Sequence, residues 1–152
     1  HKSRGAHLKL YIIGFFLFFN LLSCNKTESS SKTITVYRSP HCGCCKKWES
    51  HLEANGFKVR SEVVNDLSSV KEIQAVPPKL KSCHTAVING YLIEGHVPAD
   101  AIEKLLKEAP KDILGLSVPG MPMGSPGMEG AVNEKFDVIS FDASGKDSVF
   151  QQ

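Results

Sequence analysis

A cysteine-rich junction between two apolar segments constrains the fold of this chain more than any other feature. Residues 34–37 (ITVY) are apolar and mostly β-branched, which predicts a short buried strand. The sequence Cys42-Gly43-Cys44-Cys45 follows at once, and residues 42–54 have helical periodicity, with one apolar stripe formed by Cys45, Trp48 and Leu52. The cysteines are therefore expected at the N-terminus of a helix, where the helix dipole and free backbone N–H groups favour thiolates.

The segments that follow predict a mixed α/β domain. A second strand is expected from Phe57 to about Val64, and then a helix between Asp66, its predicted cap, and Pro77. Asn89-Gly90 is typical of a tight hairpin turn between strands at residues 85–88 and 91–97. Pro98 suits the first position of a third helix that ends before Pro110. The predicted order is β-α-β-α-β-β-α, a thioredoxin-like arrangement.

Two further segments lie beyond this minimal fold. Residues 117–130 (SVPGMPMGSPGMEG) contain three Pro, four Gly and every Met of the chain, so they predict a Met/Pro/Gly-rich loop without regular structure. Residues 136–141 and 148–150 predict a C-terminal hairpin that turns at Ser144-Gly145.

The N-terminal segment has the composition of an export signal. Residues 1–9 carry three basic side chains and no acid, and residues 10–22 are apolar except for Asn20. A helix that spans a bilayer needs about 20 apolar residues, so this run is typical of a secretory signal instead. Residues 21–24 (LLSC) resemble the lipobox of bacterial lipoproteins, although an uncleaved anchor is the alternative. We therefore expect a signal peptide at 1–23, a lipidated Cys24 with a flexible tether at 24–33, and a folded domain at 34–152.

The net charge and the cysteines are interpreted differently when the expected signal peptide is left out. The whole chain has 18 Lys and Arg against 16 Asp and Glu, but residues 24–152 have 15 against 16, a net charge of −1. This balance argues against nucleic-acid binding. The expected location is the periplasmic side of a bacterial membrane, outside the reducing cytosol. The four cysteines other than Cys24 are therefore disulfides, metal ligands or a redox pair.

Helical geometry and strand order predict that these four cysteines converge. Cys42 and Cys45 lie about 60° apart around a helix and form a C-x-x-C pair, with Cys44 on the flank. Cys83 comes just before the strand at 85–88, which in this topology adjoins the end of the first strand. Thioredoxins have a cis proline at that position. A fourth sulfur is thus expected beside the other three, and a structural disulfide pair remains the alternative.

Three segments of the chain resemble a family of bacterial periplasmic, thioredoxin-like metal-binding proteins associated with copper resistance, of the type called domain of unknown function 411. They are YRSPHCGCCKKW (37–48), SCHTAVINGYLIEGHVPADAI (82–102) and VPGMPMGSPGME (118–129), which span most of the predicted domain. The resemblance implies a thioredoxin-like fold, a role linked to copper, and Cys42, Cys44, Cys45 and Cys83 as the metal site. Members of the family are often plain periplasmic proteins, so a lipid anchor would be a departure.

Ligand chemistry favours Cu(I), in one ion or a multinuclear cluster. Soft thiolates and thioethers select Cu(I), whereas a site of cysteines alone would also suit zinc. If the Met-rich loop folds over the N-terminus of this helix, its thioethers favour copper over zinc. The alternative is that these Met side chains only fill gaps in the packing. The candidate additional ligands, or hydrogen-bond partners of the ligands, are Met121, Met123, Met128, His41, His84 and His96. Trp48 is expected in the core, His51 in solvent, and Glu94 as a plain hairpin residue.

The first hypothesis for function is an exported, membrane-tethered protein that sequesters Cu(I) and contributes to copper resistance or homeostasis, with other copper-handling proteins as partners. A rival is a thiol-disulfide oxidoreductase in which Cys42 attacks and Cys45 resolves. A copper oxidoreductase, whose thiols cycle with the metal, would join the two. The remaining class is an interaction module stapled by disulfides, with all four cysteines oxidised.

Overall fold

The computed structural model describes residues 32–152, which form one seven-stranded mixed sheet with three α-helices. The expected signal peptide, Cys24 and nearly all of the tether lie outside the described residues. The strands are β1 (Thr33–Arg38), β2 (Lys58–Val63), β3 (Thr85–Ile88), β4 (Tyr91–Glu94), β5 (Gly115–Ser117), β6 (Val138–Phe141) and β7 (Asp147–Gln151). The helices are α1 (Gly43–Ala54), α2 (Leu67–Ile73), α3 (Ala99–Glu108) and the 3₁₀ helix η1 (Pro78–Leu80).

The strand order in the sheet is β2-β1-β3-β4-β5-β6-β7. β1 pairs in parallel with β2 and β4 with β5, and the other neighbours are antiparallel. The α/β class, the order of the first seven main elements and the C-terminal β6–β7 hairpin are confirmed. β5 is not in the sequence prediction, because its three residues lie at the edge of a segment rich in Pro and Gly.

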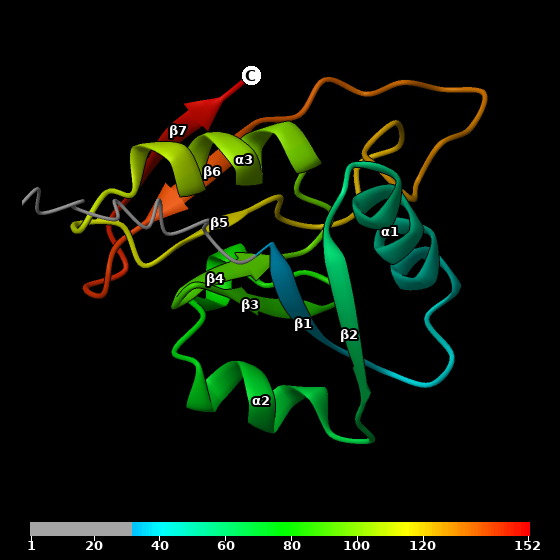
Figure 1. Cartoon of the computed structure of the whole chain (residues 1–152), viewed down its shortest axis with the longest axis horizontal. Helices are drawn as coiled ribbons and strands as arrows, with labels where there is room; N and C mark the ends of the chain where they lie inside the picture. Colours follow the sequence, from blue (N-terminus) through cyan, green and yellow to red (C-terminus); the bar gives the residue numbers. More distant parts are fainter. Residues whose placement is uncertain (1–31) are drawn as a thin grey trace, which may run out of the picture.

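Each face of the sheet packs against different helices, and β4 shows how. Ile93 is buried in the main core, which contains residues of α1 and α3, such as Leu52 and Ile102. Leu92 points to the other face and packs with Leu80 of η1. Figure 1 shows α3 and α2 on opposite sides of the sheet. Successive side chains of a strand point to opposite faces of the sheet, so the sheet separates two apolar layers.

The ends of the elements follow local chemistry, with small differences from the prediction. Cys42 and Asp66 are the N-caps of α1 and α2, and each side chain accepts a backbone N–H of the first turn. Pro98 is the N-cap of α3 instead of its first residue, because its ψ of 147° is extended. β4 ends at Glu94 instead of Val97, because Gly95 turns the chain with φ +74°.

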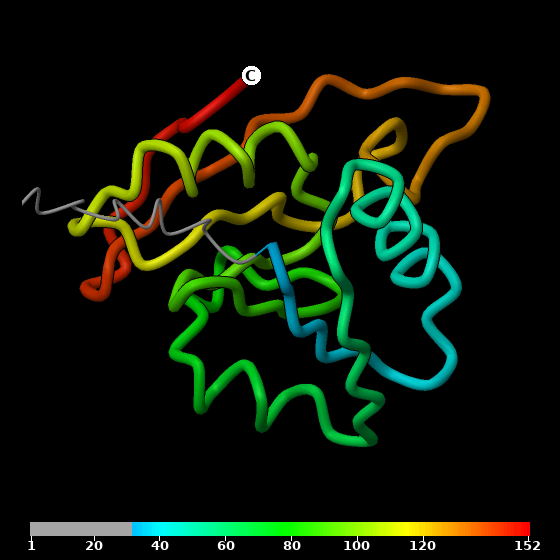
Figure 2. The backbone as a smooth tube through the Cα atoms, in the orientation of Figure 1, coloured from blue at the N-terminus to red at the C-terminus, as the bar shows by residue number. Residues whose placement is uncertain are grey.

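The Met/Pro/Gly-rich segment is irregular from Val118 onward, and Figure 2 shows it as a loop between β5 and β6. Ser117 belongs to β5, so the first residue of the predicted loop is a strand residue. Gly120 forms an isolated bridge with Ser82, which ties the loop to the segment before β3. Within residues 32–152, no helix has the length and apolar composition needed to cross a membrane.

Candidate metal centre

Three of the cysteines lie together at the start of α1. Cys42 precedes the helix, and its Sγ accepts the backbone N–H of Cys45 at 3.3 Å. Cys42 and Cys45 form a disulfide, so the predicted C-x-x-C pair is present in its oxidised form. Cys44 is a free, half-buried cysteine whose Sγ lies 3.5 Å from the Sγ of Cys42. The helix N-terminus thus presents one disulfide and one thiol at a single point.

The pairing of β1 with β3 brings the fourth cysteine, Cys83, to the start of α1. β1 and β3 are antiparallel, with Tyr37 opposite Thr85, so the residues before β3 adjoin the end of β1. Cys83 therefore lies beside α1, and its Sγ is 3.9 Å from the Sγ of Cys45. The four sulfur atoms all lie within 4.8 Å of one another, close enough to hold a metal ion. The predicted convergence is present, while the role of these residues as ligands stays a prediction.

Two imidazole rings extend this cluster on the side of Cys83. The Sγ of Cys83 lies 3.2 Å from Nδ1 of His84 and 2.9 Å from Nε2 of His96, and these three residues form a second group within 4.8 Å. Nδ1 of His96 lies 2.6 Å from the carbonyl oxygen of Pro126. Since a carbonyl can only accept, Nδ1 donates and Nε2 of the neutral ring has a lone pair toward Cys83. A backbone acceptor of this kind commonly orients metal-binding histidines.

Burial sets the protonation of the histidines. His84 and His96 are both fully buried, and the ring of His84 packs 4.3 Å from that of Trp48. Burial lowers the pKa of His84 well below its usual value, and the nearby His96 lowers it further. The pKa of His96 is also lowered, chiefly by burial. Nε2 of His84 has no hydrogen-bond partner among the described residues. Both rings are consequently neutral at pH 7 and can act as ligands.

The thiol of Cys83 keeps its proton in the metal-free protein. Burial raises its pKa to about 12, and the neighbouring Cys44 contributes in the same direction. A thiolate is the form that binds metal, so binding at Cys83 releases a proton. A soft cation held by several sulfurs supplies a positive charge that favours the thiolate of Cys83.

The Met/Pro/Gly-rich loop lies against α1 at Gly127. A Cβ built on Gly127 would lie 2.7 Å from the carbonyl oxygen of Cys44 and 2.9 Å from the backbone nitrogen of Trp48. Met128 next to it is half-buried, and Met121 is 51% exposed. The backbone of Met123 makes two hydrogen bonds with Glu134: its carbonyl oxygen accepts the Glu134 backbone N–H, and its N–H donates to the Glu134 carboxylate. His41 is exposed and belongs to neither group within 4.8 Å among the described residues.

Glu94 and His51 have roles in the structure that differ from those predicted from the sequence. Glu94 is fully buried and pairs with the buried Lys71, so it is more than a hairpin residue. An acidic side chain in an otherwise apolar strand was the available signal. His51 is half-buried and accepts the backbone N–H of Ala99 at 3.1 Å, so the expectation of a solvated side chain was wrong. Trp48 is in the core, as predicted.

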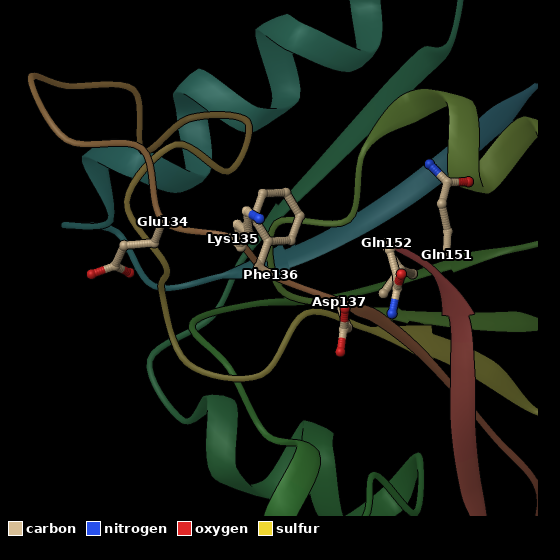
Figure 3. A pocket seen from close by; sticks show the side chains of 7 residues that line it. Glu134, Lys135, Phe136, Asp137, Gln151 and Gln152 are labelled. Atoms are coloured by element: carbon tan, nitrogen blue, oxygen red, sulfur yellow. The ribbon is translucent and has the colours of Figure 1, made fainter.

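A surface cleft lies elsewhere, at the C-terminal hairpin. Figure 3 shows its lining by side chains from the segment before β6 and from the end of the chain, among them Phe136, Asp137 and Gln152. None of the cysteines lines it. The cysteine cluster at the N-terminus of α1 is therefore separate from this cleft.

Fold and site together define a mixed α/β protein with a partly buried cluster of cysteines and histidines that could bind metal. A family model described as "Protein of unknown function, DUF411" matches residues 80–128. Two solved structures, called "Copper resistance protein copG", Form 1 and Form 2, match with 50% sequence identity and a TM-score of 0.73. Each match covers 78% of this chain and 94% of that chain. The chain belongs to the DUF411 family of copper resistance proteins, which confirms the resemblance. The comparison with curated proteins found no match.

Proposed function

We propose that this protein binds and sequesters Cu(I) through Cys42, Cys44, Cys45 and Cys83 and thereby contributes to copper resistance. The observation that carries the proposal is the convergence of four sulfur atoms, one of which, Cys83 Sγ, also adjoins two buried, neutral imidazoles. Thiolates select Cu(I), and bridging sulfurs would allow a multinuclear cluster. The names of the two solved relatives, as copper resistance proteins, support the choice of copper over zinc.

The wider setting belongs to the same proposal. The order of β1, α1, β2, α2, β3, β4 and α3 supports a thioredoxin-like fold whose first helix bears the site. The lipobox at residues 21–24 and the apolar run before it support export and attachment to the periplasmic side of a membrane through Cys24. Copper ions, and other copper-handling proteins that deliver or receive them, are the proposed partners.

An anaerobic titration of the reduced protein with Cu(I), against a competing chelator, tests the proposal. The expected result is binding that is lost when the four cysteines are replaced by serine. Binding no tighter than that of the quadruple variant would contradict it. A parallel titration with Zn(II) tests the metal, and we expect Cu(I) to displace zinc.

A second candidate function is thiol-disulfide exchange, and the Cys42–Cys45 disulfide is the observation that favours it. In this mechanism the reduced Cys42 attacks a substrate disulfide and Cys45 resolves the mixed disulfide. Insulin reduction that survives replacement of Cys44 and Cys83 by serine would support this candidate over copper binding. Copper oxidoreduction is the variant in which the same pair exchanges electrons with bound copper, and spectroscopy of the copper before and after reaction tests it.

The disulfide-stapled interaction module receives less support. It requires all four cysteines to be oxidised, whereas Cys44 and Cys83 are free in the structure. Alkylation of the native protein followed by mass spectrometry separates this class from the others, since two labelled cysteines would contradict it.

A further inference from the structure

A buried ion pair lies behind Cys83, on the face of the sheet that packs against α2. Glu94 of β4 is fully buried and Lys71 of α2 is 6% exposed. Their neighbours on this face include Leu92 and Val76, which form a small apolar cluster. Removing two charges from water costs several kcal/mol per ion, and well-packed apolar residues often stabilise a fold equally well. The fold alone therefore gives no reason for the pair.

The contacts of the Glu94 carboxylate supply a reason. Oε1 accepts the backbone N–H of Ser82 at 2.7 Å, and Oε2 accepts the hydroxyl of Thr85 at 2.6 Å. Lys71 donates to Oε1 and, at 2.9 Å, to the hydroxyl oxygen of Thr85. One carboxylate thus holds the residues on both sides of the Cys83-His84 dipeptide.

The backbone connects the Glu94 carboxylate to the cysteine cluster. Ser82 precedes Cys83, whose Sγ is 3.9 Å from Cys45 Sγ and 2.9 Å from His96 Nε2. A metal site needs its ligands within a few tenths of an ångström of their positions, so a displacement of this segment by about an ångström would disturb both distances too much for binding. Ser82 lies between η1 and β3, and its other contacts include the backbone bridge to Gly120 and a hydrogen bond from its hydroxyl to the carbonyl oxygen of Gly120.

We propose that Glu94, held by Lys71, is a positioning residue that keeps Cys83 in register with Cys45 and the two histidines. Glu94 does not touch the metal in this assignment and acts through Ser82 and Thr85. Its consequence for copper affinity rests on the proposed function, whereas its effect on the position of Cys83 does not. A purely structural role is the competing explanation, and two experiments separate them.

The first experiment measures the position of Cys83 without metal. In a Cys42→Ser/Cys44→Ser background, only Cys45 and Cys83 remain in the part of the chain that the structure describes. The dithiol-bridging reagent dibromobimane would link them. We expect Glu94→Gln to slow this cross-link by about fivefold or more, because its amide cannot accept from Ser82, Thr85 and Lys71 as the carboxylate does. An unchanged rate would overturn the proposal.

A matched control is available on the other face of the sheet. Glu49 of α1 is a comparably shielded carboxylate, with a side chain 12% exposed, and it accepts from Arg38 at 3.1 Å and from Ser61 at 2.8 Å. These contacts involve β1 and β2 but no residue of 82–85. Glu49→Gln should leave the cross-linking rate within about twofold of the background, and an effect equal to that of Glu94→Gln would overturn the proposal.

The second experiment separates positioning from stability in the otherwise unaltered chain. Lys71→Met/Glu94→Met replaces the pair by apolar side chains and should retain or raise the midpoint of thermal unfolding. We expect this variant and Glu94→Gln to bind Cu(I) about tenfold to a hundredfold more weakly, the usual effect of removing a residue that orients a ligand. If Lys71→Met/Glu94→Met has both the stability and the Cu(I) affinity of the wild type, the role of Glu94 is only structural. If the wild type itself binds no Cu(I), the proposed function fails, and the cross-linking rate still decides the role of Glu94.

Discussion

Gly127 allows the Met-rich loop to lie directly against α1, and its replacement tests that approach. Gly127 has φ +88°, and an added Cβ would lie 2.7 Å from the carbonyl oxygen of Cys44. Gly127→Ala therefore combines backbone strain with a steric conflict, and we predict a loss of about 2–4 kcal/mol in the free energy of unfolding. Gly120→Ala is the control, because Gly120 has φ +69° and open space around it. It should cost only about 1–2 kcal/mol. Equal losses in urea denaturation would contradict the close approach.

The buried His84 predicts that stability falls on mild acidification of the metal-free protein. Its pKa in the folded state is well below the usual 6.5, because the ring is fully buried beside Trp48 and His96. As pH decreases through 6.5, the unfolded chain binds a proton at this ring that the folded chain does not. The free energy of unfolding therefore decreases from pH 7 toward pH 5.5. Urea denaturation over this range measures the slope.

Replacement of His84 isolates its share of that slope. His84→Asn removes the titrating ring, and the stability of the variant should depend less on pH between 7 and 5.5. The pKa of His96 is lowered as well, so some dependence should remain. His41→Asn is the control, because it removes an imidazole from an exposed position. An identical slope in His84→Asn and in the wild type would contradict the role given to burial.

At the scale of elements, α1 is joined to the start of α3 by two side chains. The indole N–H of Trp48 donates to the carbonyl oxygen of Val97 at 2.8 Å, and Nε2 of His51 accepts from Ala99. We predict that Trp48→Phe lowers the free energy of unfolding by about 2–4 kcal/mol, because it leaves a buried carbonyl unsatisfied and a small cavity. His51→Ala should cost less, since His51 is half-buried and water can reach the freed N–H. Chemical denaturation of both variants tests this order.

The elements also show which parts of the fold can be read from sequence. α1, the α2 cap at Asp66 and the turn at Asn89-Gly90 depend on neighbouring residues, and all were predicted. β5 could not be predicted, because its three residues become a strand only by pairing with β4 and β6. The pair between Lys71 and Glu94 joins α2 to β4, and neither segment alone indicates it. Local patterns therefore define the elements, while contacts between them define the support of the site.

For the molecule as a whole, the cysteine cluster joins segments that are far apart in the chain. It unites the start of α1 with Cys83, two residues before β3, and the loop residue Pro126 orients His96 against it. The sequence predicted the four cysteines together because the strand order alone brings Cys83 to α1. It did not show how His96 is oriented, since the loop contact at Pro126 depends on the fold of an irregular segment.

Because the cluster joins segments that are far apart in the chain, Cu(I) binding should stabilise the whole molecule, and the reduced form more than the oxidised one. A ligand that binds only the folded state adds roughly 4 kcal/mol to the free energy of unfolding when its free concentration is about a thousand times its dissociation constant. For a domain of this size that raises the unfolding midpoint by roughly 10–20 °C. The Cys42–Cys45 disulfide removes two of the four proposed ligands, so the oxidised protein should show a shift less than half as large. Thermal unfolding of both forms under anaerobic conditions, with and without Cu(I), measures the difference. Equal shifts would mean that copper binds without these two cysteines, and the Cys83, His84 and His96 group would then be the site to test by substitution.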